Sequence, residues 1–554
     1  MPAITRPVVW LMFSAVVFAQ PIISPRSISN SAHYIAPGLP SGSIARGSLF
    51  SMFGLSLGPA SSPPLSFPLS TTLGAVQVIV TQGATTVNAI PTYVSGTQIN
   101  AIMPSNAPLG PVIVQVVYGG QPGTPSPANV VNASFGAYTF TGAGFGPAAM
   151  TNFVSATQQP LNTPTAPAKP GQYVTLYGTG LGPGLNADNV APQQGQLPTP
   201  VELWVGGEQI SVAYSGRSAC CSGLDQINFQ LPNDVAQGCW VPITIRTEGK
   251  TVSNTTTMSI SADGTPCNDP RNAFARPFVN GNKLGVIALL RAAVTEDVGY
   301  TSAKVVTTDT IVTMFQRESA AGLGPFNPFF ALPPAGSCLV YSPRGDMFGG
   351  DPIPLSGTTG NYLRAGAPVT LTVNGNQQVI PRPADNSRGV YPLGYTFTGS
   401  VYPSTLVLNP GTVNVGAPGG ADVAGFQSDV NIAAPLTWTN RDQTAVIDRT
   451  QGFTVNWSGA PSGQQVIVFG GGVDLPSNGS SIFVCLAPAG ANSFTVPSYV
   501  LGNIAPSRSK LLQSKGAVYV GALPTQQPTS IQPAGLDFGG ILSGTFIGKT
   551  VLFQ

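Results

Sequence analysis

TQINAIMP at residues 97–104 and DQINFQLP at residues 225–232 are nearly the same eight letters, written 225 − 97 = 128 positions apart. A second pair precedes them: ARGSLFSMFGLSLGP at 45–59 and KPGQYVTLYGTGLGP at 169–183, separated by 169 − 45 = 124 positions. Similar segments that recur in the same order along a chain indicate a duplicated unit.

The segments between these boxes match as well. LGAVQVIV at 73–80 corresponds to TPVELWVG at 199–206, and Tyr93 corresponds to Tyr214. AVQVIV and VELWV show the period of two that a β-strand with one buried face requires. Units of this size with several short strands are typical of immunoglobulin-like sandwiches. Each QIN box is therefore predicted to be one strand of a sandwich, with its Gln and Asn as structural hydrogen-bonding side chains.

The paired boxes carry a family resemblance. GSLFSMFGLSLGP with YVSGTQINAIMP, and GQYVTLYGTGLGP with DQINFQLP, resemble the bacterial IPT/TIG-type immunoglobulin-like domains. They are more closely similar to an uncharacterised secreted repeat family abundant in soil acidobacteria. The resemblance covers about residues 36–267 and implies an exported immunoglobulin-like sandwich, with no catalytic residues to carry over.

The C-terminal half keeps its β character after the repeat ends. PVTLTVNGNQQVI at 368–380 is an alternating strand, an Asn-Gly turn and a return strand, which predicts a hairpin. LGVIALLRAA at 284–293 fits a short helix or a buried strand, and its periodicity does not decide between them. Residues 268–334 are either the opening strands of the last domain or a connecting piece.

The sequence thus predicts an all-β chain: tandem immunoglobulin-like β-sandwich domains followed by a C-terminal β-sandwich region. The expected divisions are a signal peptide at 1–19, a first sandwich at 36–135, a linker at 136–168, a second sandwich at 169–267, a connecting β segment at 268–334 and a C-terminal sandwich at 335–554.

Composition excludes several classes of partner. Only 8% of the 554 residues are charged and the net charge is +2, whereas nucleic-acid binding needs a clustered basic surface. No basic run that would hold the chain to a membrane surface is present either. The polar surface must come mainly from Ser, Thr, Asn and Gln.

The N-terminus predicts export. Arg6 precedes the apolar stretch Val8–Ala19, and small residues at Val17 and Ala19 fit cleavage after Ala19. An uncleaved anchor is the alternative, although 12 apolar residues are too few to span a bilayer. We expect a chain without a transmembrane segment after cleavage, located outside the cell, at its surface or in the periplasm.

Export makes the six cysteines candidates for disulfides. They are Cys220, Cys221, Cys239, Cys267, Cys338 and Cys485. Cys338 with Cys485 is the expected bridge of the C-terminal half. In the second unit, Cys220 and Cys221 are expected to pair with Cys239 and Cys267 in one order or the other. A bond between the neighbours Cys220 and Cys221 is the alternative, and metal binding is disfavoured because no CxxC spacing occurs.

The sequence offers little for catalysis. The only histidine, His33, lies in a flexible-looking segment near the mature N-terminus, so a Ser-His-Asp triad is not expected. Asp442 and Asp448, flanked by Arg441 and Arg449, are the best carboxylate cluster, and surface ion pairs explain them more simply. We expect no catalytic residues, no cofactor and no metal.

Trp204 is the best candidate for an exposed ligand face. Period two places it on the opposite side of its strand from Val201, Leu203 and Val205. The predicted function is a non-enzymatic surface protein with an adhesion, matrix or ligand-binding role, whose partner is an extracellular glycan or a surface protein. The alternative is a carbohydrate-binding protein or a carbohydrate-active enzyme with a catalytic domain in the C-terminal half. The oligomeric state stays undetermined.

Overall fold

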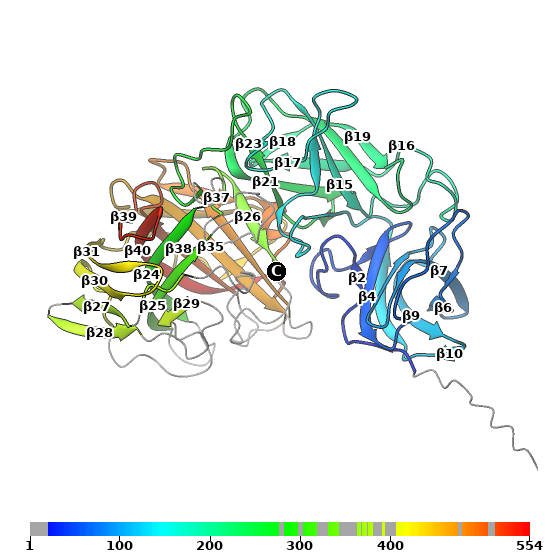
Figure 1. The fold of residues 1–554 in the computed structure, drawn as a ribbon, viewed down its shortest axis with the longest axis horizontal. Helices are drawn as coiled ribbons and strands as arrows, with labels where there is room; N and C mark the ends of the chain where they lie inside the picture. The colour runs from blue at the N-terminus through cyan, green and yellow to red at the C-terminus, as the bar shows by residue number, and fades with distance from the viewer. Residues whose placement is uncertain are drawn as a thin grey trace, which may run out of the picture.

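The computed structural model describes residues 20–275, 282–296, 303–317, 331–342, 363–366, 368–373, 375–380, 390–393, 406–474, 479–507 and 516–554. The expected signal peptide, residues 1–19, lies outside them. The chain forms two tandem immunoglobulin-like β-sandwiches followed by a C-terminal β-sandwich region. Figure 1 shows the first sandwich in blue, the second in cyan to green at the top of the view, and the C-terminal region in green to red.

The first sandwich closes through one long strand, β7 (Thr85–Val94), which pairs with β8 in one sheet and with β6 in the other. Its strands run in the order β1 (Ile22–Ile23), β4 (Leu49–Leu55), β8 (Gln98–Ile102), β7, β6 (Val76–Gln82), β9 (Gly110–Tyr118), β11 (Ser126–Val131) and β3 (Ile44–Ala45). Three short strands pair alongside, β2 (Ser29–Asn30) on β4, β5 (Thr72–Leu73) on β6 and β10 (Gln121–Pro122) on β9.

The second sandwich has two separate sheets. One runs β12 (Gly136–Ala137), β15 (Tyr173–Thr179), β20 (Asp225–Gln230), β19 (Val212–Arg217) and β16 (Gly195–Gln196), with β14 (Met150–Asn152) on β15. The other runs β13 (Gly146–Pro147), β23 (Thr256–Ile260), β21 (Gly238–Thr247), β17 (Val201–Val205) and β18 (Glu208–Ile210), with β22 (Thr251–Val252) on β21.

The duplication predicted from the QIN boxes extends to strand register. In the first sandwich Met52 of β4 pairs with Ile99 of β8; in the second, Leu176 of β15 pairs with Ile227 of β20. The offsets are again 176 − 52 = 124 and 227 − 99 = 128. Both isoleucines are fully buried, so each QIN box supplies one core residue between two outward amides.

The outward amides of the QIN boxes bond to one another, as expected of structural side chains. Gln98 Nε2 donates to Asn100 Oδ1 at 2.9 Å, and Gln226 Nε2 donates to Asn228 Oδ1 at 3.3 Å. The two copies therefore share this side-chain hydrogen bond as well as the pairing register of their strands.

The predicted domain boundaries need correction. β12 and β14, inside the expected linker 136–168, pair with β15 just as β1 and β2 pair with β4. The linker is the beginning of the second sandwich, and the first begins before residue 36. Strands of two or three residues carry no readable alternation, which is why the sequence pattern missed them.

The C-terminal region is built on one large sheet. Its path is β26 (Cys338–Tyr341), β36 (Gly479–Leu486), β35 (Gln465–Asp474), β38 (Gly516–Leu523), β40 (Phe538–Phe553), β24 (Lys283–Glu296), β25 (Lys304–Arg317) and β29 (Val390–Leu393), with β33 (Val446–Ile447) and β39 (Thr529–Ser530) on β40. Two small sheets complete the region. The first runs β28 (Asn376–Ile380), β27 (Val369–Val373), β30 (Gly411–Gly419) and β31 (Ala424–Ile432), and the second runs β32 (Thr437–Trp438), β34 (Phe453–Ser458) and β37 (Ser493–Val496).

Alternation along β40 explains how the two small sheets share the large one. Ile541 packs with the small sheet of β27, β28, β30 and β31. Val551 and Phe553 lie on the same face of β40 and pack with the small sheet of β32, β34 and β37. Leu542 and Phe546 point to the opposite face. One strand of 16 residues therefore supplies two cores on one side and an interface on the other.

The segment predicted to connect the domains is part of this sheet. β24 and β25 pair along their whole length, and β24 also lies parallel to β40. LGVIALLRAA is accordingly a strand with alternate residues on two covered faces, which accounts for its nearly continuous apolar run. The hairpin predicted at 368–380 is present as β27 and β28, with Gly375 at φ +78° in the turn.

The disulfides differ in part from the expectation. Cys338 is joined to Cys485 across β26 and β36, the expected pair. Cys239 is joined to Cys267, and Cys220 to its neighbour Cys221, so the predicted cross-pairing is wrong. Strand β20, six residues and about 20 Å long, lies in the chain between Cys221 and Cys239, whereas the Cα atoms of Cys239 and Cys267 are 5.5 Å apart. A disulfide joins Cα atoms no more than about 7 Å apart.

Stability should depend on the buried residue of the QIN box and much less on its outward neighbours. We expect Ile227→Ala to lower the free energy of unfolding by about 2–5 kcal/mol, because it opens a cavity in a packed core. Gln226→Ala, next to it on the outward face, is the matched control and should cost less than about 1 kcal/mol. Urea denaturation measures both; equal losses would contradict the assigned faces.

Candidate functional site

The carboxylates singled out in the sequence lie at the surface. Asp442 sits in a turn and forms an exposed ion pair with Arg441, at 3.0 Å. Asp448 follows the two-residue strand β33, and hydrogen bonds from Thr450 lower its pKa. Neither of them lines the groove described below. Asp442 forms a surface ion pair, as the simpler interpretation predicted, whereas Asp448 caps a turn and Arg449 donates to the carbonyl of Ile504.

His33 is buried, contrary to the expected flexible segment. Its Nδ1 accepts a hydrogen bond from the backbone N–H of Ile35 at 3.0 Å. The ring lies so close to Gly136 of the second sandwich that a Cβ there would overlap it. His33 is therefore a residue of the junction between the two sandwiches.

Trp204 lies on the outward face of β17, as the alternation predicted, but that face is covered. The side chain is only 9% exposed because its ring stacks on Tyr499 of α2 (Ser498–Leu501), with ring centroids 4.6 Å apart. The Arg246 guanidinium lies 5.0 Å from the Trp204 ring centroid, a cation–π contact. The expectation of an exposed ligand face at Trp204 is wrong, since the C-terminal region occupies it.

A second contact fixes the same two parts. Trp240 and the Cys239–Cys267 disulfide pack in one buried cluster with Leu284, Val286 and Leu542 of the large sheet. The first sandwich reaches the C-terminal region too, through Ile35 and Leu39 against Ala505. Each of the three parts therefore contacts the other two through buried side chains.

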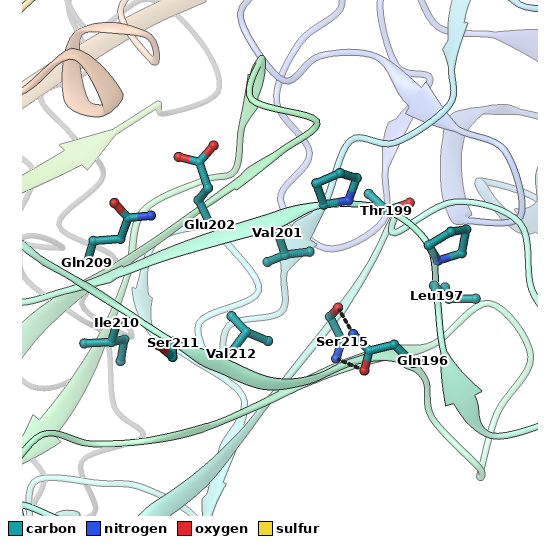
Figure 2. A pocket seen from close by; sticks show the side chains of 12 residues that line it. Gln196, Leu197, Thr199, Val201, Glu202, Gln209, Ile210, Ser211, Val212 and Ser215 are labelled. Atoms are coloured by element: carbon teal, nitrogen blue, oxygen red, sulfur yellow. Dashed lines mark hydrogen bonds between the residues drawn. The ribbon is translucent and has the colours of Figure 1, made fainter.

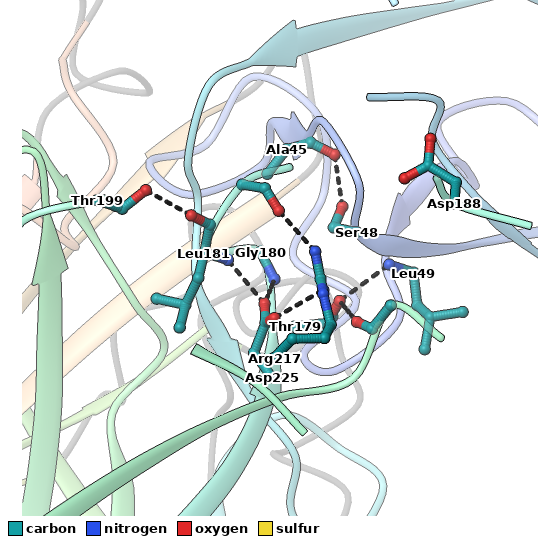
Figure 3. A network of polar contacts seen from close by, with 12 residues as sticks. Ala45, Ser48, Leu49, Thr179, Gly180, Leu181, Asp188, Thr199, Arg217 and Asp225 are labelled. Atoms are coloured by element: carbon teal, nitrogen blue, oxygen red, sulfur yellow. Dashed lines mark hydrogen bonds and ion pairs between the residues drawn. The ribbon is translucent and has the colours of Figure 1, made fainter. Parts of the chain in front are cut away.

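The junction between the two sandwiches contains a buried ion pair, drawn in Figure 3. Arg217 Nη1 bonds Asp225 Oδ1 at 2.6 Å, with side chains 4% and 0% exposed. The other oxygen of Asp225 accepts from the backbone N–H groups of Gly180 and Leu181, at 2.7 and 2.8 Å. Burial raises the pKa of Asp225, while the Arg217 guanidinium and these two N–H groups oppose the rise.

The ion pair holds the loop that touches the first sandwich. Thr179 Oγ donates to the carbonyl of Gly223 at 2.6 Å and accepts from the N–H of Leu49 at 2.9 Å. Strand β4 of the first sandwich thus begins where β15 of the second ends. The exposed Cys220–Cys221 disulfide lies in the same loop, between Arg217 and Asp225.

A groove opens on the second sandwich, shown in Figure 2, with a volume of about 670 Å³. It lies where the chain crosses from β16 in one sheet to β17 in the other, and amide and hydroxyl side chains including Gln209, Ser211 and Ser215 line it. Glu202, its one charged side chain, is paired with Arg246.

The groove follows from a difference between the two copies. In the first sandwich β5, just before β6, folds back onto β6 in the same sheet. In the second, β16 pairs with β19 in the opposite sheet, and the chain must cross between the sheets to enter β17. The copies therefore share their core strands and differ at this edge.

Within the described part of the chain, no group of three or more His, Cys, Asp or Glu side chains could hold a metal ion. No described helix has the length and apolar character that crossing a bilayer requires.

No protein-family model matches the chain, and no curated protein matches it. Among solved structures, a tetra-tandem repeat from the extending region of a large adhesion protein aligns at 12% identity and TM-score 0.12, covering 96% of this chain and 98% of that one. SGBP-B of the Bacteroides ovatus mixed-linkage glucan utilization locus, in complex with a heptasaccharide, aligns at 11% and 0.14, covering 88% and 92%. Immunoglobulin domains 1–4 of Sidekick-1 align at 10% and 0.11, covering 95% and 99%. TM-scores this low carry no argument about the arrangement or the function.

The buried ion pair yields a prediction with a rescue. Arg217→Met should lower the free energy of unfolding by about 3–5 kcal/mol, because it leaves a buried carboxylate without its counter-charge. Adding Asp225→Asn should recover most of the loss, since the amide oxygen still accepts from Gly180 or Leu181. Chemical denaturation of the three proteins measures this, and a double variant no more stable than Arg217→Met would contradict it.

Exposure should decide which disulfide is reduced first. Cys220 and Cys221 are exposed, whereas Cys239, Cys267, Cys338 and Cys485 are at most 4% exposed. Under a limiting phosphine reductant in native buffer, alkylation and peptide mass spectrometry should find label at Cys220 and Cys221 before the others. Earlier label on the buried pairs would show that the described packing is not the solution state.

Proposed function

We propose that this chain is an exported, non-enzymatic surface protein with an adhesion, matrix or ligand-binding role, and that its first two sandwiches are IPT/TIG-type repeats. The observation that carries the proposal is the burial of Trp204 against Tyr499. Because of this contact, the C-terminal region covers the outward face of β17 in the second sandwich, and the two parts are fixed relative to each other.

The junctions support a role for the array as a unit. The first and second sandwiches are joined by Thr179, Leu49 and the loop at Gly223. The second is joined to the C-terminal region by Trp204 and Trp240. A chain that fixes its domains in this way displays its remaining surfaces at constant separations, which favours attachment to an extended partner.

The surface chemistry favours an uncharged partner. With 8% charged residues and a net charge of +2, the chain has little to steer an ionic ligand. Extracellular glycans and surface proteins with few charges are the partners that fit. The three disulfides agree with an oxidising location outside the cytoplasm.

Attachment without turnover is the expected behaviour. Beads carrying the oxidised chain from Gln20 to Gln554 should be retained on immobilised extracellular polysaccharides or on surface-protein extracts, compared with beads carrying serum albumin. The same incubation, assayed for reducing ends, should release no soluble sugar. Sugar release would favour a carbohydrate-active enzyme instead, and absence of retention on every surface would contradict a binding role.

A further inference from the structure

The outer face of the sheet containing β15 and β20 is aromatic and uncharged. Outward positions of β15 carry Tyr173 and Tyr177, and those of β20 carry Gln226, Asn228 and Gln230. Phe153 joins this face, since its N–H donates to the carbonyl of Tyr173 at 2.8 Å. Tyr173 and Phe153 are each 45% exposed, so two aromatic rings lie open beside a row of amides.

Strand pairing fixes the order of these side chains. Tyr173 lies opposite Gln230, and Tyr177 opposite Gln226, on the neighbouring strand. Tyr173 and Tyr177 are four residues apart, a distance of about 14 Å along a strand. The face is therefore an aromatic and amide platform long enough for a short run of sugar rings.

The amides of this platform keep hydrogen-bonding capacity. Gln226 gives one N–H to Asn228 Oδ1. Within the described chain, the Asn228 Nδ2 group and the Gln226 Oε1 atom make no other hydrogen bond. One donor group and one acceptor thus remain for a ligand that lies across β20.

The first sandwich repeats the arrangement. Phe53 lies opposite Gln98, and Tyr93 opposite Asn100, as Tyr177 lies opposite Gln226 and Tyr214 opposite Asn228. Tyr93 is 41% exposed. Phe53 packs edge-on against Tyr34, and the Tyr214 hydroxyl bonds to the backbone of Gly195 and Arg217. Tyr93 is therefore the aromatic side chain of the first sandwich that a ligand could reach on this face.

We propose that this face, centred on Tyr173 and Phe153 in the second sandwich and on Tyr93 in the first, binds a neutral polysaccharide. The inference rests on the proposed function and names its ligand class and site. Pyranose rings present faces of C–H groups that pack on aromatic rings, and their hydroxyls pair with amides. No outward position of β15 or β20 is charged, so the face matches a neutral chain and has no group to bind an anionic one.

Affinity electrophoresis in native gels tests the proposal with galactomannan, hydroxyethylcellulose and dextran, and with polygalacturonate as the anionic comparison. The intact chain should be retarded by at least one neutral polymer. Phe153→Ala with Tyr173→Ala should weaken that association about tenfold, the change produced by losing ~1.4 kcal/mol. Tyr93→Ala should weaken it further when combined with them.

Phe67→Ala is the matched control, because Phe67 is 49% exposed and lies outside this face. It should leave retardation unchanged, and circular dichroism should show that every variant is folded. Unchanged retardation of the Phe153→Ala, Tyr173→Ala variant, or retardation by polygalacturonate alone, would overturn the site. If beads are retained on surface proteins but no neutral polymer retards the chain, the inference fails and the proposed function stands.

Discussion

Burial of Trp204 against Tyr499 requires that strand β17 of the second sandwich and helix α2 of the C-terminal region meet at one place and in one orientation. A strand that alternates polar and apolar residues has one face for its own core and one for its surroundings. On β17 Leu203 and Val205 pack in the core of the second sandwich, while Trp204 packs in that of the C-terminal region. One strand thus contributes to two hydrophobic cores, and the positions of the other surfaces depend on it.

The chain makes its junctions from few charges. At the first junction the one buried ion pair is fully bonded, by Arg217 and by two backbone N–H groups on Asp225. A buried charge without such partners would be strongly destabilising. At the same junction an amide side chain satisfies buried backbone groups, because Asn30 donates to the carbonyls of Ser134 and Thr179. Charged side chains are therefore few at the junctions between the parts, as they are in the whole sequence.

The sequence predicted what local alternation and repetition can encode. Because Ile99 and Ile227 recur with the same flanking amides, the duplicated strands and their faces could be recognised before the structure. It also paired Cys338 with Cys485, since both sit in strand-like segments. It did not anticipate what covers an outer face: Trp204 has the same alternation whether it meets water or Tyr499. It also missed β12 and β14, which are too short for a pattern, and it gave the Cys220–Cys221 bond only as the alternative to a cross-pairing, because spacing along the chain does not show which cysteines lie close in space.

Buried contacts at all three junctions predict that the two sandwiches and the C-terminal region move as one rigid body. Small-angle X-ray scattering on the oxidised chain from Gln20 to Gln554 tests it most directly. The account predicts the scattering profile of a single compact particle, with maximum dimension and pair-distance distribution independent of ionic strength between low and high salt, because the junctions are mainly apolar and hydrogen-bonded. A profile that needs an ensemble of separated domains, or a maximum dimension that grows with salt, would contradict it.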